Sequence, residues 1–192
     1  METTIKTLIN LKNGGETEME RTFDIEEFHK FLKLAKQNAW TPDAEVKKDD
    51  NLRRVDFTSE DYPGYLYWDE YHGDITFVGN EVIMYYGKVV WKNSYAGIEM
   101  ELLDDHPDGK YLLGLALMEA PIKYSYRGPR EIDYNDYKYT CMSMRLRDDY
   151  ITGTDTIIRK SDNRPIFTLS YGGSLIRTYD DGITTGDASV KK

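Results

Sequence analysis

The chain has 192 residues, a single cysteine and a formal net charge of −9, from 25 basic and 34 acidic residues. A chain of this length forms one domain or two small ones, and it buries about 70% of its unfolded surface, so its core needs no disulfide. The acidic balance disfavours direct nucleic-acid binding, because that affinity depends on lysines and arginines that neutralise phosphates. The lone cysteine is typical of a reducing compartment, and the start of the chain lacks the apolar core of a signal peptide. No apolar run approaches the roughly 18 residues of a membrane span. These features predict a cytoplasmic protein with no membrane contact.

The first part of the chain predicts a hairpin followed by a helix. Residues 3–12 alternate between apolar and polar, Asn13-Gly14-Gly15 is a turn signal, and residues 17–23 have the character of a return strand. Asp24 stands three residues before Glu27 in a capping-box pattern, and apolar residues then recur at helical spacing as far as Asn38. We therefore expect an N-terminal hairpin over residues 1–23 and a helix that begins at Asp24.

Most of the remaining chain has the period of two that is typical of strands, with local turns between the strands. Strand patterns cover residues 52–58, 65–71, 75–78, 81–86, 89–95, 137–146, 151–159 and 165–171. A second, apolar helix is expected over residues 110–119, capped by Asp108, and residues 124–136 are expected to form a loop. Residues 24–177 are thus predicted to form one α+β domain, an antiparallel meander sheet with two packed helices, followed by a flexible tail over residues 178–192.

The strand region contains an internal similarity. Its offset grows from 72 to 74 to 76 residues, as small loop insertions would make it. The matched pairs are Tyr65/Tyr137, Tyr67/Tyr139, Phe77/Ile151, Gly79/Gly153, Glu81/Asp155, Ile83/Ile157, Val90/Ile166, Trp91/Phe167, Ser94/Ser170, Tyr95/Tyr171 and Gly97/Gly173. We interpret this as a duplication of a helix plus a three-stranded meander, with halves at about residues 24–100 and 108–177. Chance agreement between two strand-rich segments is the alternative.

Several short motifs resemble an uncharacterised bacterial domain family. They are Tyr65-x-Tyr67, Phe77-x-Gly79-x-Glu81-Val82, Gly87-Lys88-x-Val90-Trp91, Ser94-Tyr95-x-Gly97, Tyr126-Arg127-Gly128-Pro129 and Ser170-Tyr171-Gly172-Gly173. The resemblance covers residues 25–177. Members of that family stand alone or follow a helix-turn-helix segment, and some are expected to be phage-encoded. By analogy, the resemblance implies a sensor or interaction role without naming an activity.

Catalytic signatures are weak in this sequence. It contains no phosphate loop, nucleophile elbow or zinc-protease motif, and its three separated histidines and one cysteine predict no metal site. Cys141 stands in the middle of a strand pattern, which predicts a buried, unreactive thiol. Glu81 and Asp155 are the candidate catalytic pair, since two carboxylates at equivalent positions could converge for acid–base chemistry. The alternative is that each carboxylate has a structural or solvated role.

The 16 tyrosines give the leading functional hypothesis. A tyrosine combines a flat apolar face with a hydroxyl group, so several of them can stack on a planar ligand. The expected binding residues are Tyr67, Tyr71, Tyr95, Arg127, Arg130, Tyr139 and Tyr171, and the arginines favour an anionic ligand. We therefore expect a non-catalytic module, without a cofactor, that binds a small planar or anionic ligand or a partner protein. The alternatives are a small enzyme that uses the paired carboxylates, and an acidic inhibitor of a nucleic-acid-binding protein.

Overall fold

The computed structural model describes residues 2–10, 16–39, 45–121, 126–146 and 150–176. Within these ranges the elements follow one another as β1 (Glu2–Asn10), β2 (Glu16–Asp24), α1 (Ile25–Ala39), β3 (Lys47–Asp49), β4 (Leu52–Phe57), β5 (Tyr65–His72), β6 (Thr76–Tyr85), β7 (Lys88–Glu99), a short 3₁₀ turn (Leu103–Asp105), α2 (Pro107–Met118), β8 (Glu131–Tyr134), β9 (Tyr137–Leu146), β10 (Tyr150–Arg159) and β11 (Arg164–Leu175). The predicted turn at residues 13–15 and the predicted tail at residues 178–192 lie outside the described residues. No helix among the described residues is long and apolar enough to cross a membrane.

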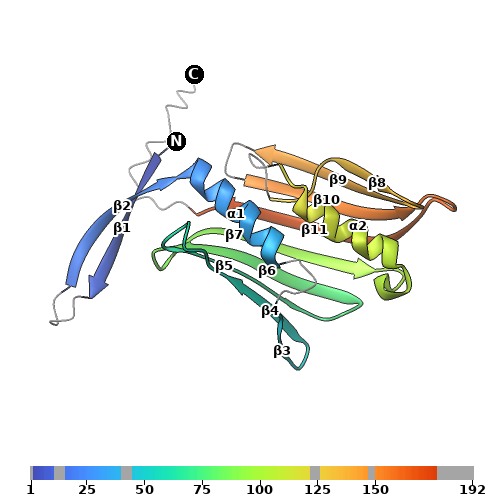
Figure 1. Cartoon of the computed structure of the whole chain (residues 1–192), viewed down its shortest axis with the longest axis horizontal. Coiled ribbons are helices and arrows are strands. Elements are labelled where there is room, and N and C mark those ends of the chain that lie inside the picture. Colours follow the sequence, from blue (N-terminus) through green and yellow to red (C-terminus); the bar gives the residue numbers. More distant parts are fainter. Residues whose placement is uncertain (1, 11–15, 40–44, 122–125, 147–149, 177–192) are drawn as a thin grey trace, which may run out of the picture.

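The main sheet of the described chain is antiparallel throughout and has nine strands in the order β3-β4-β5-β6-β7-β11-β10-β9-β8. Both helices lie on the same face of this sheet, and the β1–β2 hairpin projects beyond the start of α1 (Figure 1). Aromatic and aliphatic side chains from the covered face pack against α1 and α2 to form one core. The predicted α+β class, with an antiparallel meander sheet and two packed helices, is confirmed.

The helices follow their sequence signals closely. The carboxylate of Asp24 accepts a hydrogen bond from the backbone N–H of Glu26 at 2.8 Å, as expected of a residue that caps α1. The predicted cap of the second helix is wrong: α2 begins at Pro107, and His106 precedes it without a side-chain capping bond. A proline at the first helical position explains the earlier start, because its fixed φ suits that position and it has no N–H to leave unpaired.

Three strand predictions need correction. Residues 76–85 form one continuous strand, β6, and not two strands interrupted at Gly79. Residues 131–134, expected to be loop, form β8, which turns at Asn135 (φ 48°) and pairs with β9. Each half therefore has a helix and at least four strands, instead of the three expected. Strands β8, with four residues, and β3, with three, were missed because such short segments show too little alternation of apolar and polar residues to be recognised.

Apart from β3, which has no counterpart in the described sheet, the strand order is symmetric about the contact between β7 and β11. Tyr95 lies directly opposite Tyr171 in this pair, and each tyrosine lies next to a glycine on its other side, Gly79 on β6 or Gly153 on β10. A Cβ atom on Gly79 would lie 2.5 Å from the Tyr95 hydroxyl, and one on Gly153 would lie 2.6 Å from the Tyr171 hydroxyl. Each tyrosine ring thus lies across a glycine, and a residue with a side chain at that position would clash with the ring. This symmetry supports the duplication, which stays a prediction.

Candidate functional site

A cluster of buried charged residues lies between the helices and the sheet. Lys36 on α1 and Glu81 on β6 are both fully buried, and their Nζ and Oε1 atoms are 2.7 Å apart. The Lys36 ammonium also donates to the backbone carbonyl of Tyr126 at 2.5 Å. Lys36 therefore ties α1 both to the sheet and to the loop that precedes β8.

The Glu81 carboxylate has hydrogen bonds on both of its oxygens. The Tyr67 hydroxyl donates to Oε1 at 3.1 Å and the Asn93 amide donates to Oε2 at 2.8 Å. Burial favours a higher pKa for Glu81, but the charges of Lys36 and Arg127 and the hydrogen bonds from Lys36 and Asn93 outweigh it and hold the pKa below its usual value. Burial lowers the pKa of Lys36, and the charge of Glu81 opposes this shift. The Glu81 carboxylate is consequently charged, and its contacts join α1 to strands β5 and β7.

A second buried ion pair lies in the other half of the molecule. Arg127, in the loop before β8, donates from Nε and Nη2 to Oδ2 of Asp155 on β10, each at 2.6 Å. The Arg127 guanidinium carbon also lies 5.3 Å from the centre of the Tyr171 ring, in cation–π geometry. Asp155 therefore fixes a buried arginine next to the symmetric centre of the sheet.

Asp69 leaves the buried cluster with more acids than bases. Among the buried described residues there are three carboxyl groups, on Asp69, Glu81 and Asp155, and two long cations, Lys36 and Arg127. The Tyr95 hydroxyl donates to Asp69 Oδ1 at 2.6 Å. Burial, reinforced by the charge of Glu81, raises the pKa of Asp69 to about 7. Near neutral pH this carboxyl group therefore exchanges a proton.

Asp69 should make the stability of the protein depend on pH between about 4 and 7. The unfolded chain releases this proton near pH 4, whereas the folded protein keeps it until about pH 7. Stability from this group is thus full below about pH 4 and is lost as the pH rises through 7, with a total change on the order of 4 kcal/mol. We expect Asp69→Asn, which stays neutral and can still accept from Tyr95, to remove this fall.

Urea denaturation at pH 5, 6, 7 and 8 measures the effect directly. The gain in stability of Asp69→Asn over the unmodified protein should grow as the pH rises, and the exposed substitution Asp105→Asn should leave the profile unchanged. Parallel profiles for the unmodified protein and Asp69→Asn would contradict the assignment of a raised pKa to Asp69.

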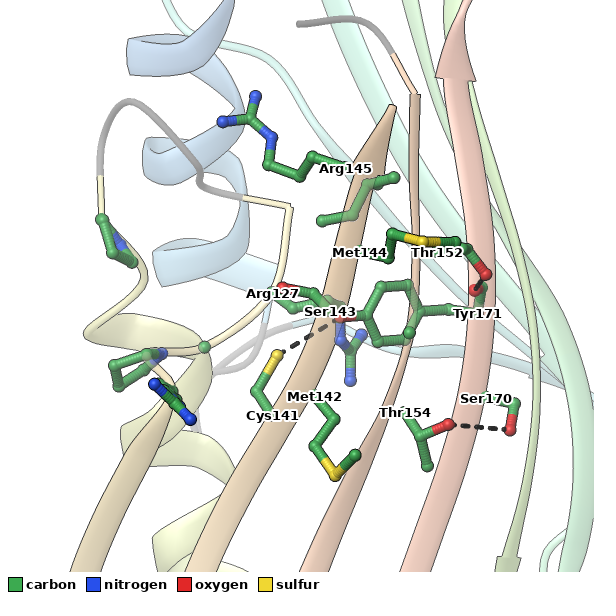
Figure 2. Close-up of a pocket in the computed structure, with 16 residues that line it drawn as sticks. Arg127, Cys141, Met142, Ser143, Met144, Arg145, Thr152, Thr154, Ser170 and Tyr171 are labelled. Atoms are coloured by element: carbon green, nitrogen blue, oxygen red, sulfur yellow. Dashed lines mark hydrogen bonds between the residues drawn. The ribbon is translucent and has the colours of Figure 1, made fainter. Parts of the chain in front are cut away.

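A hollow of about 800 Å³ opens beside the loop that carries Arg127. The short β8 pairs only with the first part of β9, and the Cys141 N–H donates to the Arg130 carbonyl at 2.9 Å, so beyond Cys141 the outer edge of β9 faces this hollow. Arg127, Cys141 and Tyr171 come from three different elements and converge there (Figure 2), and the Cys141 thiol lies 3.3 Å from the Tyr171 hydroxyl. Arg130 and Arg145 complete a lining with three arginines.

A smaller cavity, of about 140 Å³, lies between α2 and the sheet on the other side of the symmetric centre. Tyr95 lines this cavity, just as its symmetric counterpart Tyr171 lines the hollow. The rest of its wall combines Tyr71 and Phe77 with leucines of α2 and with the carboxyl-bearing side chains of Asp74 and Glu99. Arg127 reaches both spaces, because its loop lies over the centre of the sheet.

The seven predicted binding residues fall into three places. Arg127, Arg130 and Tyr171 line the hollow, and Tyr71, Tyr95 and again Arg127 line the smaller cavity. Tyr67 and Tyr139 are completely buried in the core and line neither space. Arg130 is exposed, whereas Arg127 is buried and ion-paired. The structure thus brings these residues to two separate spaces and to the core between them.

The candidate catalytic carboxylates, Glu81 and Asp155, lie on the same covered face of the sheet, and each binds its own buried cation. No described hydrogen bond joins the two carboxylates. Cys141 is buried as predicted, and burial raises the pKa of its thiol to about 11. The described residues contain no group of three or more histidine, cysteine or acidic side chains that could hold a metal ion.

Sequence reasoning missed Lys36, Asp69, Asn93 and Arg145 as members of these sites. A signal for Lys36 did exist, because it continues the apolar positions Phe28 and Leu32 at a spacing of four residues and therefore lies on the buried stripe of α1. Asp69 likewise continues the alternation of Tyr65 and Tyr67 on β5. Asn93 and Arg145 gave no local signal, since their roles depend on residues from distant strands.

Comparison with known proteins identifies a family for this chain. No curated protein matches it, and no solved structure matches it. A family model described as a domain of unknown function, DUF5680, matches residues 69–178. The match runs from β5 through β11, begins later than the expected boundary at residue 25, and includes both the hollow and most of the buried cluster. Because it spans more than half of the 192 residues, the chain belongs to the DUF5680 family.

Proposed function

We propose that this protein is a non-catalytic binding module that holds a small anionic ligand in the hollow beside Arg127. The observation that carries the proposal is the convergence of three arginines, Arg127, Arg130 and Arg145, on one hollow of a protein with a net charge of −9. Arginine side chains recognise carboxylate and phosphate groups through several parallel hydrogen bonds. A volume of about 800 Å³ also lies within the range of small-molecule sites.

The three arginines are held in different ways that suit such a role. Asp155 engages Nε and Nη2 of Arg127, so this guanidinium is positioned before any ligand arrives. The guanidinium carbon of Arg145 lies 5.8 Å from the centre of the Tyr126 ring, so Arg145 packs against the loop that also carries Arg127. Arg130 is exposed and makes no side-chain hydrogen bond or ion pair with the described residues. Arg130 is therefore the arginine whose charge remains most available to a ligand.

An apolar wall completes the hollow. Met142 and Met144 on the edge strand β9 line it, although they are 78% and 56% exposed. Exposed methionines are costly in water, and their flexible thioethers adapt well to flat or irregular apolar surfaces. Arginines on one side and methionines on the other favour a ligand with an anionic group and a flat apolar part, such as a nucleotide.

Binding of adenosine monophosphate and of adenosine, measured by calorimetry and thermal shift, tests this proposal. We expect the monophosphate to raise the Tm by several degrees at millimolar concentration and neutral adenosine to have little effect, because the arginines act on the charged group. Binding should weaken with added salt, as expected for a partly exposed charge contact. No response to the monophosphate, or an equal response to both compounds, would refute the proposed site.

Arg130→Ala locates the site, and Arg164→Ala is its matched control. Arg130 lines the hollow, whereas Arg164 is exposed at the start of β11 and lies outside it. Loss of one charged hydrogen-bonding group should weaken the binding of the monophosphate by about tenfold or more in Arg130→Ala. Arg164→Ala should bind normally. Equal affinities in the two variants would place the bound nucleotide elsewhere.

A further inference from the structure

The smaller cavity between α2 and the sheet has an aromatic wall. Phe77 forms the middle of this wall, with ring centres 6.1 Å from Tyr71, 6.3 Å from Tyr95 and 6.0 Å from Phe167. Leu113 and Leu117 of α2 close the opposite side. The four rings come from four strands, so the cavity exists only in the assembled sheet. Aromatic faces carry partial negative charge and attract cations that lie over them.

Carboxylates give this cavity a negative potential. Oε2 of Glu99 accepts a hydrogen bond from the backbone N–H of Leu103 at 2.9 Å, and Oε1 has no hydrogen-bond partner among the described residues. Asp74 lines the cavity with an exposed side chain, and among the described residues its one ion pair is the long contact of 3.4 Å with Arg53. Burial raises the pKa of Tyr71, the charge of Asp69 raises it further, the charge of Arg53 opposes the shift, and the charges of Asp74 and Glu99 add to it.

Arg127 is the one cation that the described cavity wall contains, and Asp155 offsets its charge through two contacts of 2.6 Å. Behind Tyr95, Glu81 and Asp155 are paired with Lys36 and Arg127, so the carboxylates that act on the cavity are those of Glu99 and Asp74 in its wall. An entering cation would therefore meet aromatic faces and these two carboxylates. The same aromatic faces and carboxylates would repel an anion. This cavity and the arginine-lined hollow therefore favour ligands of opposite charge.

We propose that this cavity is a second binding site, and that it takes a small alkylammonium ion. An apolar cavity of about 150 Å³ holds a molecule of the size of benzene. The volume of about 140 Å³ found here thus suits a small alkylammonium ion of about the size of benzene. Alkylammonium groups have an apolar surface with a diffuse positive charge, which is the combination that aromatic rings flanked by carboxylates recognise. The site shares Arg127 with the proposed anion site, but this proposal does not depend on that one.

Choline and its neutral isostere 3,3-dimethylbutan-1-ol provide the test, because they have almost the same shape and differ in charge. Ligand-observed NMR and calorimetry on the full chain should show binding of choline, with its methyl resonance shifted upfield by the surrounding rings. The alcohol should bind roughly tenfold more weakly, since it lacks the cation–π and carboxylate interactions. Equal binding of both compounds, or no binding of choline, overturns the proposal.

Two variants connect the binding to this cavity. Glu99→Gln keeps an acceptor for the Leu103 N–H but removes the charge, and should weaken choline binding by about tenfold. Leu113→Phe fills the space from the α2 side and should abolish binding without changing any charge. Glu131→Gln on β8, outside the cavity, makes the same chemical change and should bind normally. Normal choline binding in both Glu99→Gln and Leu113→Phe would also overturn the proposal.

Discussion

Replacing Lys36 with methionine should lower the free energy of unfolding by about 3–5 kcal/mol, the cost of leaving a buried charge without its partner. Lys36 is completely buried, and its ammonium group contacts both Glu81 and the Tyr126 carbonyl. Methionine has a similar length, so the apolar packing of α1 is largely retained. The expected loss therefore comes from the stranded Glu81 carboxylate and from the lost hydrogen bond to the Tyr126 carbonyl.

A second substitution separates the charge effect from packing. Glu81→Gln in the Lys36→Met background removes the stranded charge and keeps one acceptor oxygen, which can accept from either Tyr67 or Asn93. The double variant should recover part of the lost stability, so the two substitutions should be strongly non-additive. Lys30→Met, on the exposed side of the same helix, is the matched control. Urea denaturation of five proteins measures this: the unmodified protein, Lys36→Met, Glu81→Gln, the double variant and Lys30→Met. An equal effect of Lys36→Met and Lys30→Met would refute the buried ion pair.

Replacing Arg127 with methionine should have an effect of similar size, about 3–5 kcal/mol, because Asp155 is also completely buried. The carboxylate would lose its contacts from Nε and Nη2, and the Tyr171 ring would lose the guanidinium group that lies over it. Arg127→Lys should rescue little, since one ammonium group cannot reproduce two directed hydrogen bonds from a planar guanidinium.

The double variant Arg127→Met/Asp155→Asn tests the source of this loss. Without a buried negative charge, the double variant should be more stable than Arg127→Met alone. Arg164→Met, on an arginine whose side chain is 70% exposed, should change stability little. Thermal and urea unfolding of the four proteins suffice for the comparison. If Asp155→Asn adds a further loss to Arg127→Met instead of reversing part of it, the ion pair is not what holds Arg127 in place.

The symmetry of the sheet explains why two different spaces occur at related positions. Tyr95 and Tyr171 lie opposite each other on β7 and β11. The hydroxyl of each reaches past the adjacent strand to the next one out, where it meets Asp69 on β5 in one half and Cys141 on β9 in the other. Asp69 pairs with Glu81 in register, as Cys141 pairs with Asp155. The two halves thus share a backbone plan but have different side chains, and this gives one space an aromatic, acidic lining and the other an arginine-rich one.

Local patterns in the sequence determined the secondary structure and the fold class. The alternation in residues 65–71 and 137–146 and the apolar stripe of α1 depend on neighbours only a few residues away, so they can be recognised without the fold. The equivalence of Tyr95 with Tyr171 could also be found from spacing alone. The predicted break at Gly79 failed because a glycine usually weakens a strand, whereas here the Tyr95 ring occupies the space that a side chain would fill.

The sites were decided only by the tertiary structure. Arg127 looked like a free loop cation, yet the fold buries it against Asp155, 28 residues away. Lys36 meets Tyr126 across 90 residues, and Phe77 meets Phe167 only because β7 and β11 are neighbours in the sheet. Such contacts depend on which strands pair and in what register. The sequence by itself could therefore name the tyrosines and arginines, and the pairing of β7 with β11 determined which of them line a cavity and which are buried in the core.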